Sequence, residues 1–256
     1  MIRAVTSVAE AVEQAVAVLD SEQLQRDYWE QEEFLVIKQF LSRAYVEEVL
    51  VPQAEGVKSE INRNYIPGHK KGGSVSYYTV QEKAPGFLDL YRSESFRTFL
   101  SRLTGKELMR CPDHDPHSCA LYYYTEPGDH IGFHYDTSYY KGARYTILMG
   151  LVDRSVSCKL VCELFRNHPT KQPRRLELVT EPGDLVMFNG DKLWHAVTPL
   201  GAGEERIVLT MEYVTNPDMH PLKRLYSNLK DSFGYFGLRT VFKRAWSGSK
   251  GASLRP

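Results

Sequence analysis

The 256-residue sequence predicts an α+β fold with an antiparallel barrel or jelly roll at its centre, on two observations. Apolar side chains recur three and four residues apart in most of residues 1–117, as on one face of a helix. From Ser118 the chain instead carries short strand-like runs separated by turns rich in Gly, Pro, Asp and Asn. We therefore expect a single domain, 1–256, in which residues 1–117 form helical support and a substrate loop, 118–215 the jelly-roll core and 216–256 a helical tail.

The helical elements are predicted from their spacing and from one cap. Ser7 and Glu10 have the spacing of a capping box at the start of the first helix, which extends to about Leu19. Helical spacing continues over 21–39, and the same spacing returns over 43–53 and 84–108. Residues 63–80 differ, because one Pro, three Gly and two Lys lie among aromatic residues. That composition predicts a mobile loop that enters a strand.

The core is predicted to contain about eight strands. Each run is short, and turn residues separate it from the next, which is the rhythm of an antiparallel sandwich or barrel. In chain order the runs are CALYYYT, HIGFHYD, RYTILMGLV, KLVCELF, RLELVT, DLVMFNG, HAVTPL and RIVLTMEYV.

Bulk composition excludes several classes of protein. With 42% hydrophobic and 25% charged residues, the chain has the average make-up of a folded globular protein rather than a disordered one. Equal numbers of basic and acidic residues, 32 each, give no overall charge that would favour nucleic acid or a membrane surface. No apolar run approaches the roughly 20 residues of a membrane span, and acidic residues interrupt the N-terminal stretch where a signal peptide needs an apolar core. Reduced thiols in the cytoplasm are the simplest interpretation of only four cysteines, Cys111, Cys119, Cys158 and Cys162.

The first chemical signal is the triplet His134-Tyr-Asp136. Residues i and i+2 of a strand share one face, so this strand can offer an imidazole and a carboxylate to one metal ion. About one His-x-Asp/Glu triplet is expected by chance in a chain of this composition, and this is the only one. The triplet alone therefore decides little.

Two later residues strengthen the signal. His195 follows on another predicted strand after a Pro-Gly-Asp turn, and Arg206 opens the next one. Two histidines and one carboxylate make a facial triad with open positions, the arrangement of non-haem Fe(II) oxygenases. The guanidinium of an arginine presents a fixed fork for a carboxylate, and a charged residue at the head of an apolar strand needs a partner such as an exogenous dicarboxylic acid.

In this order and spacing, HYD, LWHAV and ERIVLT resemble the motifs of the Fe(II)/2-oxoglutarate-dependent oxygenases, over roughly Ser118–Thr215. The resemblance implies a double-stranded β-helix, a jelly roll flanked by helices. It also implies that His134, Asp136 and His195 hold Fe(II), and that Arg206 pairs with the distal carboxylate of 2-oxoglutarate. O₂ is then the second co-substrate, and succinate and CO₂ are released as a C–H bond of the substrate is hydroxylated. Related halogenases have Gly or Ala at the position of Asp136, which disfavours halogenation here.

Further cofactor contacts follow from the resemblance less directly. The family often places a tyrosine on the strand before the turn, which makes Tyr122 and Tyr124 candidates, although their spacing to the turn differs by one residue from the commonest pattern. The family's Arg-x-Ser is Arg206-Ile-Val208 in this sequence, so no hydroxyl follows at that position. Thr146 and Thr210 are the candidates to replace it.

Substrate contacts are expected from loops at the metal end of the barrel. The two lysines and Arg144 indicate an anionic group, such as a carboxylate or phosphate, although a solvated surface is the plain alternative. We also expect the 63–75 loop to close over the substrate. The candidates are Asn64, Tyr65, His69, Lys70, Lys71, His130, Thr137, Tyr139, Tyr140 and Arg144.

The favoured substrate is a small molecule, an amino acid or a biosynthetic intermediate, because the chain has no accessory segment for gripping a protein or a duplex. Nucleic acid is thus an improbable partner, and an oxygenase acting on a protein side chain or nucleic acid is the first alternative. The others are a non-catalytic jelly-roll binding protein and a zinc hydrolase with the same ligands. The sequence does not indicate the oligomeric state.

Two other segments have a plain and a functional interpretation. A small zinc site among Cys111, His114, His117 and Cys119 is conceivable, but their spacing matches no standard finger. Residues 221–256 hold eight basic residues and one acidic residue, interleaved with aromatics. This tail fits a basic amphipathic helix that touches a membrane surface, an acidic carrier or nucleic acid, or one whose aromatics pack on the barrel or on a second subunit.

Overall fold

The centre of the protein is one continuous, strongly curled β-sheet. A computed structural model describes residues 7–112, 115–136 and 138–218, and within these the sheet has the order β1-β10-β7-β12-β5-β3-β6-β11-β8-β9, with β2 paired to β3 and β4 to β12. All the strand pairs are antiparallel. The strands are β1 Phe34–Ile37, β2 Asn62–Ile66, β3 Lys70–Val75, β4 Met109–Arg110, β5 Cys119–Tyr124, β6 His130–His134, β7 Arg144–Asp153, β8 Leu160–Leu164, β9 Arg174–Leu178, β10 Leu185–Asn189, β11 Trp194–Val197 and β12 Arg206–Val214.

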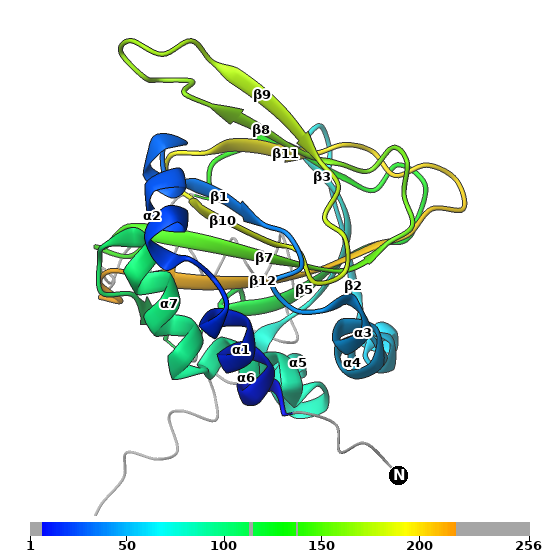
Figure 1. Cartoon of the computed structure of the whole chain (residues 1–256). Coiled ribbons are helices and arrows are strands. Elements are labelled where there is room, and N and C mark those ends of the chain that lie inside the picture. The colour runs from blue at the N-terminus through cyan, green and yellow to red at the C-terminus, as the bar shows by residue number, and fades with distance from the viewer. Residues whose placement is uncertain (1–6, 113–114, 137, 219–256) are drawn as a thin grey trace, which may run out of the picture.

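The curl brings two parts of this sheet face to face (Figure 1). One layer contains β1, β10, β7, β12 and β5, and the other contains β6, β11, β8 and β9, with β3 joining them along one side. This is the jelly-roll arrangement that the eight strand-like runs predicted, and those runs correspond to β5 through β12.

Helices cover the outer face of the first layer (Figure 1). Ser7 caps the first helix with the capping box that the sequence predicted. The elements are α1 Val8–Ala17, α2 Ser21–Glu30, α3 Arg43–Tyr45, the π-helical turn η1 Val46–Leu50, α4 Val51–Gly56, the 3₁₀ turn η2 Lys58–Glu60, α5 Tyr77–Lys83, α6 Pro85–Arg92 and α7 Glu94–Thr104. None of the described helices is long and apolar enough to cross a bilayer.

The alternation of side chains along β5, β7 and β12 separates the main core from the inner space. Leu121, Ile147 and Leu209 point outward and join the large apolar cluster under the helices. Their neighbours Tyr122, Leu148 and Val208 point inward and line the space between the two layers. A one-residue register shift would exchange the two sets, so the buried helical cluster fixes which residues face inward.

Two sequence predictions were wrong in this half of the chain. Helical structure was predicted over 21–39, but α2 ends at Glu30, and Phe34–Ile37 pairs with β10 instead. Glu32 and Glu33 have φ values of 61° and 62°, which a continuing helix cannot accommodate. The predicted mobile loop over 63–80 is the β2–β3 hairpin followed by α5, with Gly68 at φ 72° in its turn. The predicted tail helix lies almost wholly in residues 219–256, outside the described residues.

Candidate active site

Three of the predicted ligands meet inside the curl of the sheet. His134 ends β6 and pairs with His195 on β11, and Asp136 follows two residues after His134. Their ligand atoms all lie within 4.8 Å of one another. The carboxylate of Asp136 lies 3.3 Å from Nε2 of His134 and 3.6 Å from Nε2 of His195. In the part of the chain that the structure describes, this is the only cluster of three such residues that could hold a metal ion.

Backbone contacts orient both imidazoles. Nδ1 of His134 lies 2.9 Å from the carbonyl of Gly132, and Nδ1 of His195 lies 3.1 Å from that of Leu193. Because a carbonyl oxygen only accepts, each Nδ1 donates, and in the neutral imidazole each Nε2 then has a lone pair directed at the centre. This is the tautomer that a metal ligand requires.

The charges of the three groups are strongly coupled. Burial raises the pKa of Asp136, but the neighbouring charges of His195, His134 and Arg144 more than offset this and hold that pKa well below its usual value. Burial lowers the pKa of His195. For His134 burial also lowers the pKa, but the hydrogen bond and charge of Asp136 raise it above its ordinary value. The centre therefore offers an ionised carboxylate to a cation.

Asp136 is held by two segments, the loop that follows β10 and the strand β7. Its backbone N–H donates to the carbonyl of Gly190 at 2.9 Å, and Thr146 Oγ1 donates to its carboxylate at 2.8 Å. A Cβ on residue 190 would lie 2.8 Å from Cβ of Asp136, closer than unbonded carbons approach. Only glycine permits this close packing, so Gly190 and Thr146 together position the carboxylate.

The three ligands lie on a cavity of about 330 Å³ between the two layers. The inward residues of β12 line it from Arg206 through Val208 and Thr210 to Glu212. Glu212 pairs in register with Thr146, the residue that contacts Asp136, whereas Arg206 lies six residues further back along the strand. The cavity therefore extends from the metal-ligand cluster in two directions.

One half of the cavity ends at Arg206, which is 1% exposed. Its Nη2 donates to Thr180 Oγ1 at 3.0 Å, and its guanidinium lies 5.2 Å from the ring centroid of Tyr124. Asp153 approaches only to 3.8 Å from Nε, and neither that nitrogen nor Oδ2 of Asp153 has a hydrogen-bond partner in the described structure. The arginine therefore has a protein counter-charge, which the sequence did not predict, and also an unused buried donor.

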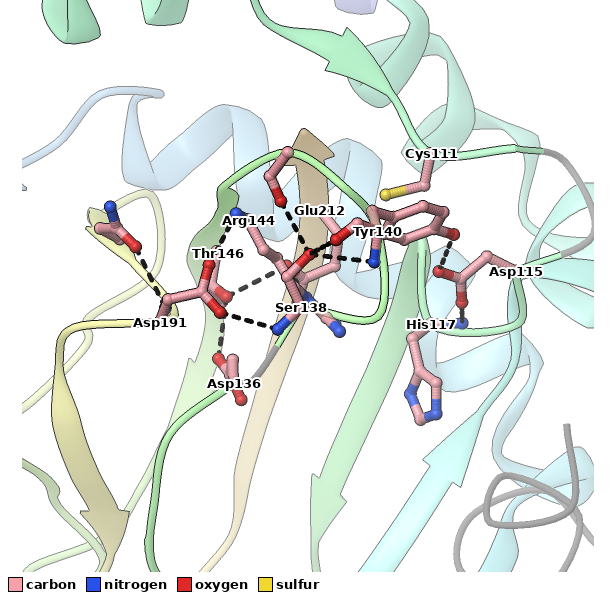
Figure 2. A network of polar contacts seen from close by, with 12 residues as sticks. Cys111, Asp115, His117, Asp136, Ser138, Tyr140, Arg144, Thr146, Asp191 and Glu212 are labelled. Atoms are coloured by element: carbon pink, nitrogen blue, oxygen red, sulfur yellow. Dashed lines mark hydrogen bonds and ion pairs between the residues drawn. The ribbon is translucent and has the colours of Figure 1, made fainter. Parts of the chain in front are cut away.

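The other half contains the polar network of Figure 2. Arg144 Nε donates to Glu212 at 2.9 Å, and the same carboxylate oxygen lies 3.0 Å from Thr146 Oγ1. The contacts thus connect Arg144, Glu212 and Thr146 to Asp136 (Figure 2). Burial raises the pKa of Glu212 to about 7, although Arg144 lowers it.

Asp115 lies in the same half. It accepts a hydrogen bond from Tyr140 Oη at 2.7 Å and one from the backbone N–H of His117 at 2.8 Å. Asp115, Tyr140 and His117 all line the cavity. A second carboxylate therefore stands near the Arg144–Glu212 pair.

The structure brings most of the predicted cofactor and substrate residues to this cavity. Beyond the ligands and Arg206, these are Tyr122, Tyr124, Thr146, Thr210, His69, Tyr139, Tyr140 and Arg144. Thr146 contacts Asp136, and the hydroxyl of Thr180 accepts a hydrogen bond from Arg206.

Five predicted substrate contacts do not line the cavity, among them Asn64 on β2. Tyr65 is 69% exposed, and His130 turns its ring to the carbonyl of Gly128. Lys70 is 1% exposed with Nζ over the ring of Tyr122, because it lies on a strand and not in a loop. Lys71 Nζ donates to the carbonyl of Pro127 at 2.7 Å. Thr137 lies outside the described residues.

Sequence reasoning missed three cavity residues, Glu212, Asp115 and His117, and also missed Thr180, which contacts Arg206. A signal existed for Glu212, since it shares the inward face of β12 with Arg206 by simple alternation. Thr180 precedes β10 in a turn, and no pattern in the sequence connects it to Arg206.

The cysteines take no part in this site. All four are free and buried. Cys111 packs with Tyr140 and Val214, whereas Cys119 belongs to the core under the helices. The zinc-site hypothesis has no support in these positions, and its His114 lies outside the described residues.

Comparison with known proteins gives a fold. No family model matches the chain, and no curated protein matches it. Solved structures do match, among them the non-haem α-ketoglutarate-dependent epimerase SnoN from nogalamycin biosynthesis, with a TM-score of 0.61, 14% identity and coverage of 75% of this chain and 81% of that chain. A prolyl hydroxylase from Trichoplax adhaerens, in complex with a peptide fragment of the hypoxia-inducible factor oxygen degradation domain, matches with a TM-score of 0.61 and 14% identity. The match covers 84% of this chain and 94% of that chain. A Pseudomonas putida prolyl-4-hydroxylase matches with a TM-score of 0.56 and 15% identity, and the match covers 76% of this chain and 97% of that chain.

The chain has the fold of the Fe(II)/2-oxoglutarate oxygenases. At 14–15% identity this likeness is one of architecture, and the residues of the chain itself must carry any statement about chemistry. In this oxygenase fold, the cluster of His134, Asp136 and His195 is the candidate metal centre.

Proposed function

We propose that this single-domain protein is an Fe(II)- and 2-oxoglutarate-dependent oxygenase that hydroxylates a C–H bond of a small molecule, with release of succinate and CO₂. The observation that carries the proposal is the presence in one cavity of a two-histidine, one-carboxylate cluster and a buried arginine with an unused donor. A buried N–H donor without a hydrogen-bond partner, here Nε of Arg206, is costly unless a ligand supplies an acceptor for the guanidinium.

The donor set fits Fe(II), because two neutral imidazoles and one carboxylate leave coordination positions open. His134, Asp136 and His195 would hold the ion, and Arg206 would pair with the distal carboxylate of 2-oxoglutarate beside Tyr124 and Thr180. Bound iron with its co-substrate supplies the activation of O₂ and the oxidation of the substrate. The chain supplies position: Thr146 and Gly190 hold Asp136, and the apolar residues Ile131, Leu148 and Val197 exclude water.

The size of the cavity supports a small-molecule substrate. About 330 Å³ is at the lower end of the range for ligand pockets, and 2-oxoglutarate takes a part of it. The solved structures of this fold named above include an epimerase as well as hydroxylases, so the outcome of the oxidation is part of the proposal. The Trichoplax adhaerens prolyl hydroxylase is in complex with a peptide, so a protein substrate is the alternative for this chain.

The test is the anaerobic addition of Fe(II) and 2-oxoglutarate to the whole protein. We expect a weak visible charge-transfer band, and succinate formation once air is admitted. Replacing Asp136 with Gly should abolish both, whereas His168→Gln, at a histidine of the β8–β9 loop that is distant from the cluster in sequence, serves as the matched control. A protein that binds 2-oxoglutarate without either signal would be the non-catalytic binder, and undiminished turnover of Asp136→Gly would contradict the ligand assignment.

A further inference from the structure

The half of the cavity opposite Arg206 contains a second arginine with unused donors. Arg144 uses Nε for Glu212, and its side chain is 13% exposed. A guanidinium carries five N–H donors, four of them on Nη1 and Nη2. Across the described residues, no group hydrogen-bonds to either of these two nitrogens of Arg144. Arg144 lines the cavity, so the free side of its fork is available to a ligand.

A planar oxyanion is the ligand that suits this fork. Two parallel N–H donors match the two oxygens of a carboxylate, and Glu212 holds the guanidinium in place from the Nε side. The site is therefore oriented before any ligand binds, which lowers the entropy cost of binding.

The charge balance of this half adds a second requirement. Two acidic side chains, Asp115 and Glu212, line this half together with one basic residue, Arg144, so a carboxylate ligand alone would bring a third acidic group next to them. Only one oxygen of Glu212 contacts Arg144 and Thr146, and the second accepts no hydrogen bond from the described residues. A ligand that also carries an ammonium group would offer hydrogen-bond donors and a positive charge to these acidic side chains.

We propose that the substrate is a zwitterion, an amino-carboxylic acid whose carboxylate binds Arg144 and whose ammonium group is bound by Glu212 and Asp115. This inference rests on the proposed oxygenase function, because it assigns the substrate half of the same cavity. Arg144 precedes Thr146 by one inward position of β7, about 6.6 Å. Since Thr146 contacts Asp136, the oxidised carbon should lie only a few bonds from the carboxylate.

The first test measures binding without turnover. Individual L-α-amino acids with short aliphatic, long aliphatic, aromatic and cationic side chains are titrated calorimetrically into the iron-free whole protein. Each is compared with its methyl ester, which lacks the carboxylate, and its N-acetyl derivative, which lacks the ammonium group. We expect at least one free amino acid to bind about tenfold or more tightly than both derivatives. Equal binding of the free acid and either derivative, or no binding of any amino acid, would overturn the inference.

The second test uses a variant and a matched control. Arg144→Gln should weaken binding of that amino acid by about 10- to 100-fold, and Arg144→Lys should recover part of the loss, because an ammonium replaces the charge but not the fork. Arg175→Gln is the control, since Arg175 lies on β9 beside the ring of Phe133 and outside the cavity. Unchanged binding by Arg144→Gln would contradict the assignment even if the amino acid binds.

Failure of the inference can be told apart from failure of the proposed function. If succinate forms from 2-oxoglutarate in the presence of Fe(II) and air but no amino acid binds, the oxygenase function is supported and the zwitterionic substrate is contradicted. Absence of the charge-transfer band and of succinate would remove the oxygenase, and with it the inference.

Discussion

The two arginines of the cavity are held in different ways. Arg206 donates a hydrogen bond to the hydroxyl of Thr180 at 3.0 Å, whereas its acidic neighbour Asp153 lies 3.8 Å from Nε without a hydrogen bond. Arg144 instead has a direct hydrogen bond of 2.9 Å to Glu212. A third arginine, Arg63, shows what a purely structural pair looks like, because it contacts both oxygens of Asp129 at 2.9 and 2.6 Å. The pair outside the cavity is complete, and those inside it leave donors for ligands.

The largest effect is expected from Arg206→Gln. The change leaves Asp153 buried without a counter-charge, which should cost about 3 kcal/mol of unfolding free energy, and it should weaken 2-oxoglutarate binding by about 100-fold. Chemical denaturation and calorimetry measure the two effects separately. The double variant Arg206→Gln/Asp153→Asn should recover stability but not binding. If both recover, Arg206 is as structural as Arg63 and the contrast between them fails.

Asp129→Asn examines the structural pair itself. Asp129 is buried, and it also accepts from the backbone N–H groups of Thr125 and Glu126, so we expect a loss of about 2 kcal/mol. Burial raises its pKa, but the hydrogen bonds from Arg63 and the backbone lower it below 3.8 overall. A depressed pKa stabilises the fold above the unfolded value and loses that contribution as pH falls through the folded value. The unfolding free energy of the wild type should therefore fall more steeply below pH 3.8 than that of Asp129→Asn, and parallel pH profiles would contradict the pairing.

In both halves of the cavity, strand residues such as Arg206 and Arg144 were predictable, whereas the loop residues Asp115 and Thr180 were not. Side chains alternate along the apolar strand β12, which places Arg206 on its inward face, toward the cavity that also contains the metal ligands. Asp115 lines the cavity from the loop before β5, and Thr180 contacts Arg206 from the turn before β10. No periodicity applies to either segment. Local pattern fixes the faces of a strand, but it does not fix which loops meet across a barrel.

The wrong predictions have a related cause. Gly, Pro and Lys in residues 63–80 are typical of a loop, yet β3 pairs with both β5 and β6 and so joins the two layers. Phe34–Ile37 fits a helical spacing, yet it adds a strand beside β10. In both segments, pairing with strands distant in the sequence outweighed the local composition. A single sequence does not show such long-range pairing.

Gly190→Ala should have an intermediate effect confined to the metal centre. The new Cβ would lie 2.8 Å from Cβ of Asp136 and 3.2 Å from Thr146 Oγ1, so the loop or the carboxylate must move. We expect a loss of about 1–2 kcal/mol in stability and about tenfold in Fe(II) affinity, because Asp136 leaves the position that Thr146 and Gly190 impose. Metal titration measures the second effect. The control is Gly56→Ala, where a new Cβ meets nothing within 4 Å. An equal loss of Fe(II) affinity in both variants would show that Gly190 has no special role.

The smallest effect is expected from Thr180→Val, which removes the hydroxyl that accepts a hydrogen bond from Arg206. Valine keeps the shape of threonine, so packing is preserved and the lost hydrogen bond should cost about 1 kcal/mol of stability. The guanidinium would then be held by Tyr124 and the distant Asp153 alone, and 2-oxoglutarate binding should weaken by about three- to tenfold. Thr180→Ser restores the hydroxyl and should restore the affinity, which separates positioning of Arg206 from a general loosening of the turn. If Thr180→Val loses stability but keeps full affinity for 2-oxoglutarate, the orientation of Arg206 does not depend on that hydroxyl, and the cofactor half of the cavity is less pre-organised than the Arg144 half.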